Sequence, residues 1–132
     1  MSWRLENEGD EMIKTHGLNH ISLNVRDPDR ALRFYEQVFG VKEYYRDEQS
    51  VQVQGPGSHD VIAFEKKAAN AGKSGGIAHF GFRLVDPQDI DLAVAEVRRA
   101  GGTIVEQGEF EPGFPFAFVE DPDGYQIEIW FE

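Results

Sequence analysis

The sequence describes a small, acidic chain without cysteine. It has 132 residues, of which 40% are hydrophobic, and a formal net charge of -11 at pH 7. This length can bury one hydrophobic core but is too short for two ordinary domains. The acidic charge disfavours nucleic acids and membrane surfaces as partners, and the lack of cysteine excludes disulfides and thiolate metal sites. Without an apolar spanning run or signal peptide, we expect a cytoplasmic protein.

An internal repeat organises the chain. Residues 20–29 align without a gap with residues 79–88. In both copies an Asp-Pro pair, Asp27-Pro28 or Asp86-Pro87, supplies a helix N-cap followed by proline at the first helical position. Apolar residues at helical spacing follow each pair, so each copy is predicted to enter a helix directly.

Each repeat continues as a helix followed by three strands. The helices are expected to end at Gly40 and at Gly101-Gly102. Short β-like runs then predict strands at 43–45, 51–54 and 61–65 in the first half, and at 103–106, 114–120 and 125–131 in the second. Each half is therefore predicted to be a βαβββ module, which gives an α+β fold.

The predicted boundaries divide the chain into an arm and one domain. Residues 1–16 show no convincing period and are interpreted as an N-terminal arm. The single domain spans 17–132, and it comprises module one (17–67), a small flexible linker (68–76) and module two (77–132). Within module two, Asp121-Pro122-Asp123-Gly124 predicts a tight turn, so the two final strands should form a hairpin.

Strand alternation gathers the polar residues of both modules on one kind of face. Because side chains at i and i+2 share a face, His20 lies opposite the apolar series that begins at Ile21, and His79 lies opposite Phe80. We expect the apolar faces to cover the helices and the polar half-sheets to curve around a central cleft, where small-molecule sites form. Four side chains could line this cleft or serve packing: Tyr45, Arg83, Phe116 and Trp130.

Histidine and carboxylate side chains on these faces have the chemistry of a divalent-metal site. His20, His79 and Glu128 would supply two imidazoles and one carboxylate, which suit one Zn, Mn, Fe, Co or Ni ion and leave positions open for substrate or water. A lone strand histidine is more often an ordinary hydrogen-bonded residue, but two at matching repeat positions favour ligands. His16 and His59 are interpreted as surface residues.

These patterns together resemble the glyoxalase, bleomycin-resistance and extradiol-dioxygenase superfamily, also called vicinal oxygen chelate. The resemblance covers residues 17–131 and rests on the paired modules, on His-Ile-Ser-Leu-Asn-Val and Ala-His-Phe-Gly-Phe-Arg-Leu at their openings, and on the closing Val-Glu-Asp-Pro-Asp-Gly-Tyr-Gln-Ile-Glu-Ile. It implies two βαβββ modules around a cleft, with His20 and His79 as the two histidine ligands and Glu128 as the last carboxylate ligand.

One position departs from the glyoxalase-type pattern. Where those members carry a fourth ligand, usually Glu, within a Val-Ile-Glu-Leu run, this chain has Ala63, with Glu65 one step later on the same face. Alanine cannot bind metal. The departure disfavours lactoylglutathione lyase activity, whereas three-ligand members such as fosfomycin-modifying transferases and dioxygenases fit the ligand count better.

The resemblance thus implies a divalent-metal-dependent enzyme that acts on a small oxygenated substrate by metal chelation and oxyanion stabilisation, as a lyase, isomerase, transferase or extradiol-type dioxygenase. Glu65 is the candidate catalytic base. The alternative is a non-catalytic small-molecule binder of the bleomycin-resistance type, which the presence of all three ligand residues disfavours. Strand edges predict a homodimer. A site within one chain and a site across a swapped dimer both stay open.

Overall fold

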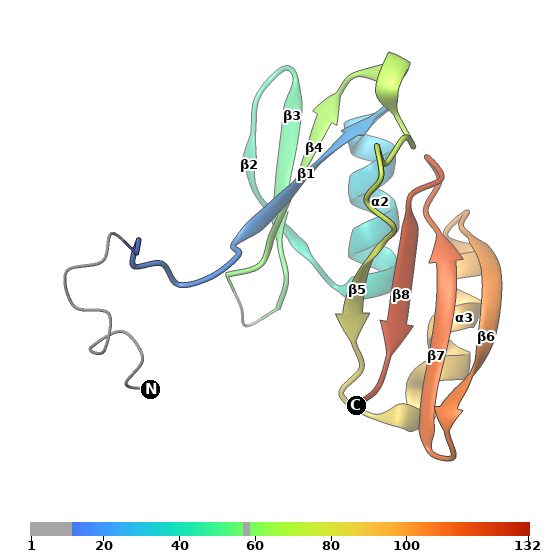
Figure 1. Cartoon of the computed structure of the whole chain (residues 1–132). Coiled ribbons are helices and arrows are strands. Elements are labelled where there is room, and N and C mark those ends of the chain that lie inside the picture. Colours follow the sequence, from blue (N-terminus) through green and yellow to red (C-terminus); the bar gives the residue numbers. More distant parts are fainter. Residues whose placement is uncertain (1–11, 57–58) are drawn as a thin grey trace.

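The computed structural model describes residues 12–56 and 59–132, which form two βαβββ modules (Figure 1). Module one contains β1 (His20–Val25), α2 (Pro28–Phe39), β2 (Lys42–Arg46), β3 (Ser50–Gln54) and β4 (Val61–Lys66). Module two contains β5 (Phe80–Arg83), α3 (Ile90–Arg99), β6 (Thr103–Glu111), β7 (Phe114–Glu120) and β8 (Gln126–Trp130). The predicted α+β class and module order are confirmed. Most of the predicted N-terminal arm lies outside the described residues.

Each module builds one mixed sheet, and the two sheets have the same topology. Sheet one has the order β1-β4-β3-β2 and sheet two the order β5-β8-β7-β6. In both, the first strand pairs in parallel with the last, and the remaining pairs are antiparallel. The repeat read from the sequence is therefore a repeat of strand order and pairing as well.

The two helices begin at the predicted Asp-Pro pairs but in different ways. The Asp27 side chain accepts hydrogen bonds from the backbone N–H groups of Asp29 and Arg30, and α2 ends at Gly40 with φ 67°. The Asp86 side chain also caps its chain segment, by accepting from the N–H of Gln88. Here the first turn is a 3-10 turn at Pro87–Asp89, so α3 starts later than the N-cap signal predicted.

Several other predicted strand boundaries also differ from the structure, most of them by one residue. The second-module opening strand begins at Phe80, and His79 directly precedes it. β6 continues to Glu111 because its pairing with β7 is maintained past two irregularities in register. The last strand begins one residue after Tyr125, since the Tyr125 carbonyl closes the turn by accepting from the Asp121 N–H. The linker contains a short 3-10 turn at Ala68–Asn70.

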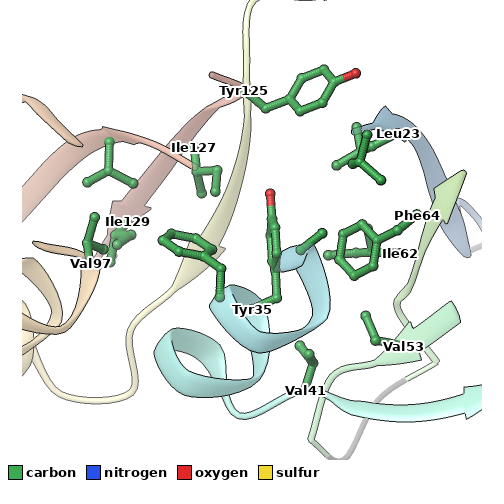
Figure 2. Packing of buried hydrophobic residues seen from close by; sticks show 14 of the residues in the cluster. Leu23, Tyr35, Val41, Val53, Ile62, Phe64, Val97, Tyr125, Ile127 and Ile129 are labelled. Carbon is green, nitrogen blue, oxygen red and sulfur yellow. The ribbon is translucent and has the colours of Figure 1, made fainter. Parts of the chain in front are cut away.

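The apolar faces of both sheets bury against one hydrophobic core. Figure 2 shows Tyr35 of α2 between Ile62 and Phe64 of sheet one and Ile127 and Ile129 of sheet two. These residues belong to a single buried cluster that also includes the inner side of α3. We call the core-facing side of each sheet its inner face and the opposite side its outer face. The outer faces carry His20, Glu65 and Glu128 among other residues, and they are turned away from the shared core.

A buried carboxylate from module two also joins the modules. Asp123 lies in the turn between β7 and β8, and its side chain is 1% exposed. Its Oδ1 atom accepts a hydrogen bond from the backbone N–H of Arg26 and lies 2.9 Å from the Arg30 guanidinium. The predicted turn is thus also an attachment point for module one. No helix in the described part of the chain is long and apolar enough to cross a membrane.

Candidate metal centre

His79 and Glu128 lie together on the outer face of sheet two. Their Nε2 and Oε1 atoms are 3.2 Å apart, and the side chains are 34% and 15% exposed. The imidazole also meets the edge of the Phe118 ring, with centroids 5.1 Å apart. One ring nitrogen and one carboxylate oxygen are therefore positioned side by side at a surface that a small molecule can reach. This donor pair fits a divalent ion that prefers nitrogen and oxygen ligands.

Gly81 allows this pair to form. It pairs with Glu128 across the parallel β5–β8 ladder. A Cβ atom at position 81 would stand 2.8 Å from the Glu128 carbonyl oxygen and 3.5 Å from its Cβ. The strands could not keep their spacing with a larger residue there. The glycine in the His79-Phe80-Gly81 run thus holds the Glu128 strand close to β5.

His20 lies on the other sheet and is held by a different partner. It opens β1, it is exposed, and its Nδ1 atom lies 2.7 Å from the Asn19 side-chain oxygen. Residues 12–56 and 59–132 contain no group of three His, Asp or Glu side chains that could hold an ion within one chain. The structure therefore brings together two of the three predicted ligands, His79 and Glu128, and leaves His20 apart from them.

The repeat geometry places Ala63 at the module-one counterpart of Glu128. Ser22 pairs with Ala63 in sheet one as Gly81 pairs with Glu128 in sheet two. Ala63 is 4% exposed and offers no donor atom. Glu65 follows on the same face, where its Oε2 atom accepts a hydrogen bond of 3.3 Å from the Ser22 hydroxyl. Module one therefore carries His20 and, two residues beyond the position equivalent to Glu128, the carboxylate of Glu65. It has no counterpart of the adjacent His79–Glu128 pair.

The remaining predicted site residues divide into two groups. His16 and His59 are exposed and line a surface hollow of about 850 Å³, in agreement with their interpretation as surface residues. Tyr45 donates a hydrogen bond to the exposed Asp47, and Arg83 pairs with Glu132, so neither bonds to the His79–Glu128 pair. Phe116 and Trp130 do lie on the outer face of sheet two. They contact two rings that the sequence interpretation did not single out, Phe110 and Phe118.

A small cavity lies beside His79, between β1, the linker and the start of β8. It has a volume of about 130 Å³, and its lining includes Ser22, Asn24, Lys73 and Gln126. The Tyr125 hydroxyl closes one side by donating a 2.6 Å hydrogen bond to the Asn24 carbonyl oxygen. The cavity lies between the edges of the two sheets and is lined by polar groups of both modules.

Paired βαβββ modules with histidines at matching strand positions define a class of proteins built by duplication of one small module. The family model for the glyoxalase/bleomycin resistance protein/dioxygenase superfamily matches residues 17–129. The chain belongs to this superfamily.

Curated relatives carry the names of enzymes. A probable lactoylglutathione lyase of Vibrio parahaemolyticus is 33% identical over 83% of this chain and 86% of its own length. The lactoylglutathione lyase of Haemophilus influenzae is 30% identical over 83% of this chain and 88% of its own. A lactoylglutathione lyase of Arabidopsis thaliana is 32% identical, but the chain spans only 42% of that longer protein.

Solved structures confirm the fold. The fosfomycin resistance protein FosX of Mesorhizobium loti superposes with a TM-score of 0.74 at 21% identity, over 90% of this chain and 94% of that one. A lactoylglutathione lyase from Agrobacterium tumefaciens superposes with a TM-score of 0.68 at 17% identity, over 89% and 95%. At these identities the likeness concerns the arrangement of the two modules.

Proposed function

We propose that the protein is a divalent-metal-dependent enzyme of lyase or isomerase type that acts on a small substrate with adjacent oxygen atoms. The observation that carries this proposal is the His79–Glu128 pair, with Nε2 and Oε1 3.2 Å apart on an accessible sheet face. Relatives named lactoylglutathione lyase, at 30% and 33% identity, favour this reaction type over ring cleavage. A bound divalent ion would supply Lewis-acid polarisation of the substrate oxygens.

The site is completed by a second copy of the chain in this proposal. His79 and Glu128 lie on the outer face of sheet two, whereas His20 lies on sheet one, and both inner faces are occupied by the shared core. Two copies related by a twofold axis can place sheet one of each against sheet two of the other. The dimer would then hold two equivalent sites, each with His20 from one chain and the His79–Glu128 pair from its partner.

Glu65 is the group that would accept a proton from the substrate. Its carboxylate lies on the same outer face as His20, and the Ser22 hydroxyl holds it by a hydrogen bond. Ala63 supplies no carboxylate at the module-one position equivalent to Glu128, so Glu65 is the strand carboxylate nearest to that position on this face. Glu65 can then receive a substrate proton at a carboxylate oxygen and return it to a neighbouring carbon, which is the proton movement that an isomerisation needs.

Metal titration of untagged protein tests the ligand set. We expect about one divalent ion per chain, and we expect His20→Ala, His79→Ala and Glu128→Ala each to remove most of the binding, because three ligands leave no redundancy. His59→Ala, at an exposed histidine outside the set, is the matched control and should bind as the wild type does. Full metal binding by the His20→Ala/His79→Ala double variant would contradict the site.

Mixing two defective variants tests whether the site forms between chains. His20→Ala and His79→Ala proteins each lack one ligand in every site. If subunits exchange freely, a mixed dimer contains one site with all three ligands, so equal mixing should restore about a quarter of the sites. A site within one chain would gain nothing from mixing. Metal content and turnover are measured before and after exchange, and light scattering follows the dimer.

A further inference from the structure

We propose that the outer face of sheet two binds a flat apolar group of the substrate, such as an aromatic ring, beside the metal ligands. This inference rests on the proposed function for the position of the reacting oxygens, and it names the class of substrate. The group would lie on four side chains that we call the aromatic wall: Phe110, Phe116, Phe118 and Trp130.

The aromatic wall is a continuous set of ring contacts that begins at His79. The Phe118 ring meets the His79 imidazole edge-on, and Phe116 meets Phe118 with centroids 5.7 Å apart. Phe110 stacks on Phe116 at 4.4 Å and also meets Trp130 edge-on at 6.4 Å. A flat apolar group on this surface would therefore stand directly next to the candidate metal ligands.

The backbone makes room for these rings. Gly108 pairs with Phe116, and a Cβ atom on Gly108 would come within 3.2 Å of the Phe116 ring. The absence of a side chain at Gly108 therefore lets the Phe116 ring lie over β6. Phe110 falls within the register irregularity between Glu109 and Glu111 and reaches over the same ring.

The two modules differ in the residues on their outer faces, so the repeat by itself does not predict aromatic residues on the outer face of sheet two. Phe116, Phe118 and Trp130 have counterparts at the equivalent paired positions of sheet one. These counterparts are polar: Ser50, Gln52 and Glu65. An outer face in contact with water ordinarily carries such polar residues. The face that bears His79 and Glu128 has rings at all three positions instead.

Within one chain the wall presents exposed apolar surface beside the candidate metal ligands. Phe110 is 55% exposed, and Phe118 and Trp130 are partly exposed. Contiguous exposed rings on a soluble protein mark binding surfaces, and aromatic groups gain from stacking as well as from burial. Because the wall adjoins the His79–Glu128 pair, its occupant is the part of the substrate next to the reacting oxygens.

Two probes with identical oxygens test the proposal. Mandelate and lactate share a hydroxyl group, a carboxylate and one charge, and they differ in carrying a phenyl ring or a methyl group. We expect mandelate to bind about tenfold more tightly, because the ring is buried against the wall. Trp130 reports binding by fluorescence in a Trp3→Phe background, since Trp3 is the other of the two tryptophans in the sequence.

Variants of the aromatic wall test whether the wall causes the preference for mandelate over lactate. Phe110→Ala removes an exposed ring and should reduce the mandelate preference to at most about threefold, with metal content unchanged. Phe116→Leu, which keeps apolar volume, should reduce it as well. Leu92→Ala is the control, because Leu92 is 62% exposed on α3, which packs on the inner face. It should preserve the full preference.

The outcomes separate the two proposals. Equal affinities for mandelate and lactate, or a preference that survives both Phe variants, would overturn the aromatic wall. Phe110→Ala that weakens self-association in sedimentation, without changing the preference, would assign the wall to a second copy of the chain and also overturn it. A mandelate preference that depends on Phe110 in a protein that binds no metal would support the wall and remove the proposed enzyme function alone.

Discussion

Tyr35 donates a 2.7 Å hydrogen bond from its hydroxyl to Asp121 Oδ2 and so joins helix α2 of module one to the β7–β8 turn of module two. Both side chains are buried. The other oxygen, Oδ1, accepts from the backbone N–H groups of Asp123, Gly124 and Tyr125. One carboxylate therefore shapes its own turn and fixes that turn to the other module. Burial raises the pKa of Tyr35 well above its usual range and also raises the pKa of Asp121.

Removing the Tyr35 hydroxyl should destabilise the whole protein. In Tyr35→Phe the buried Asp121 Oδ2 loses its partner, so we expect the free energy of unfolding to fall by about 1–3 kcal/mol. Urea denaturation followed by circular dichroism measures the change. Tyr45→Phe is the control, because the Tyr45 hydroxyl bonds at an exposed site and its loss should leave the free energy of unfolding nearly unchanged. Equal losses in the two variants would contradict a structural role for the Tyr35–Asp121 contact.

Asp121 should give stability a pH dependence of defined sign. Its pKa is raised in the folded protein, chiefly by burial, from an ordinary value of 3.8. The folded state then holds this proton more tightly than the unfolded state, so the contribution is present below pH 3.8 and is lost as pH rises through the folded pKa. Asp121→Asn does not titrate. The unfolding free energy of the wild type relative to Asp121→Asn should therefore decrease as pH rises above 3.8 and then level off. An increase over that range would show the opposite shift.

Glu65 and Glu128 should respond differently to loss of charge. Glu65→Gln is expected to keep metal and lose turnover, because Glu65 is placed as a base, whereas Glu128→Gln should lose metal. Ala63→Glu should tighten metal binding by restoring a carboxylate at the rung equivalent to Glu128. Parallel metal titrations of the three variants measure this. Equal weakening by Glu65→Gln and Glu128→Gln would instead make Glu65 a fourth ligand and exclude the three-ligand arrangement.

Gly81→Ala should disturb the candidate metal centre by changing the spacing of the two strands that carry it. Its new Cβ atom would meet the Glu128 carbonyl oxygen at 2.8 Å, so β5 and β8 must separate and carry Glu128 away from His79. We expect weaker metal binding and a loss of about 1–3 kcal/mol in unfolding free energy. Gly108→Ala is the comparison, because its Cβ meets only the Phe116 ring, at 3.2 Å, and that ring can move. Metal affinity that is unchanged in Gly81→Ala would contradict this account of the site.

Most of the fold follows from local signals in the sequence. The Asp27-Pro28 pair, the helical spacing after it and Gly40 predict α2, and the matching run in module two predicts its counterpart. Turn chemistry at Asp121 also predicts the final hairpin, because the side chain bonds to its own turn. Alternation along the strands correctly separates the residues that enter the core from those that face outward.

The parts of the site that depend on long-range contacts were not visible in the sequence. Tyr35 and Asp121 form a buried hydrogen bond although they lie 86 positions apart, and no periodic pattern in the sequence reveals such a contact. The turn motif at Asp121 therefore predicted only a hairpin. Alternation along β7 groups Phe118 with Phe116 and could have indicated a second ring there. Phe110 gave no such signal, because it lies in an irregularity where alternation fails. His20 and His79 have matching positions in the repeat, but equivalence within a module does not fix the distance between modules.

The shared core also determines how the protein can be taken apart. Phe64 from module one and Ile127 from module two are buried in the same cluster, so neither half can cover its apolar residues alone. A break in the peptide chain between the exposed glycines Gly75 and Gly76 would therefore separate two fragments that still need each other. Expressed as two polypeptides, they should assemble into one molecule, and that split pair would allow each module to be labelled, mutated or exchanged independently.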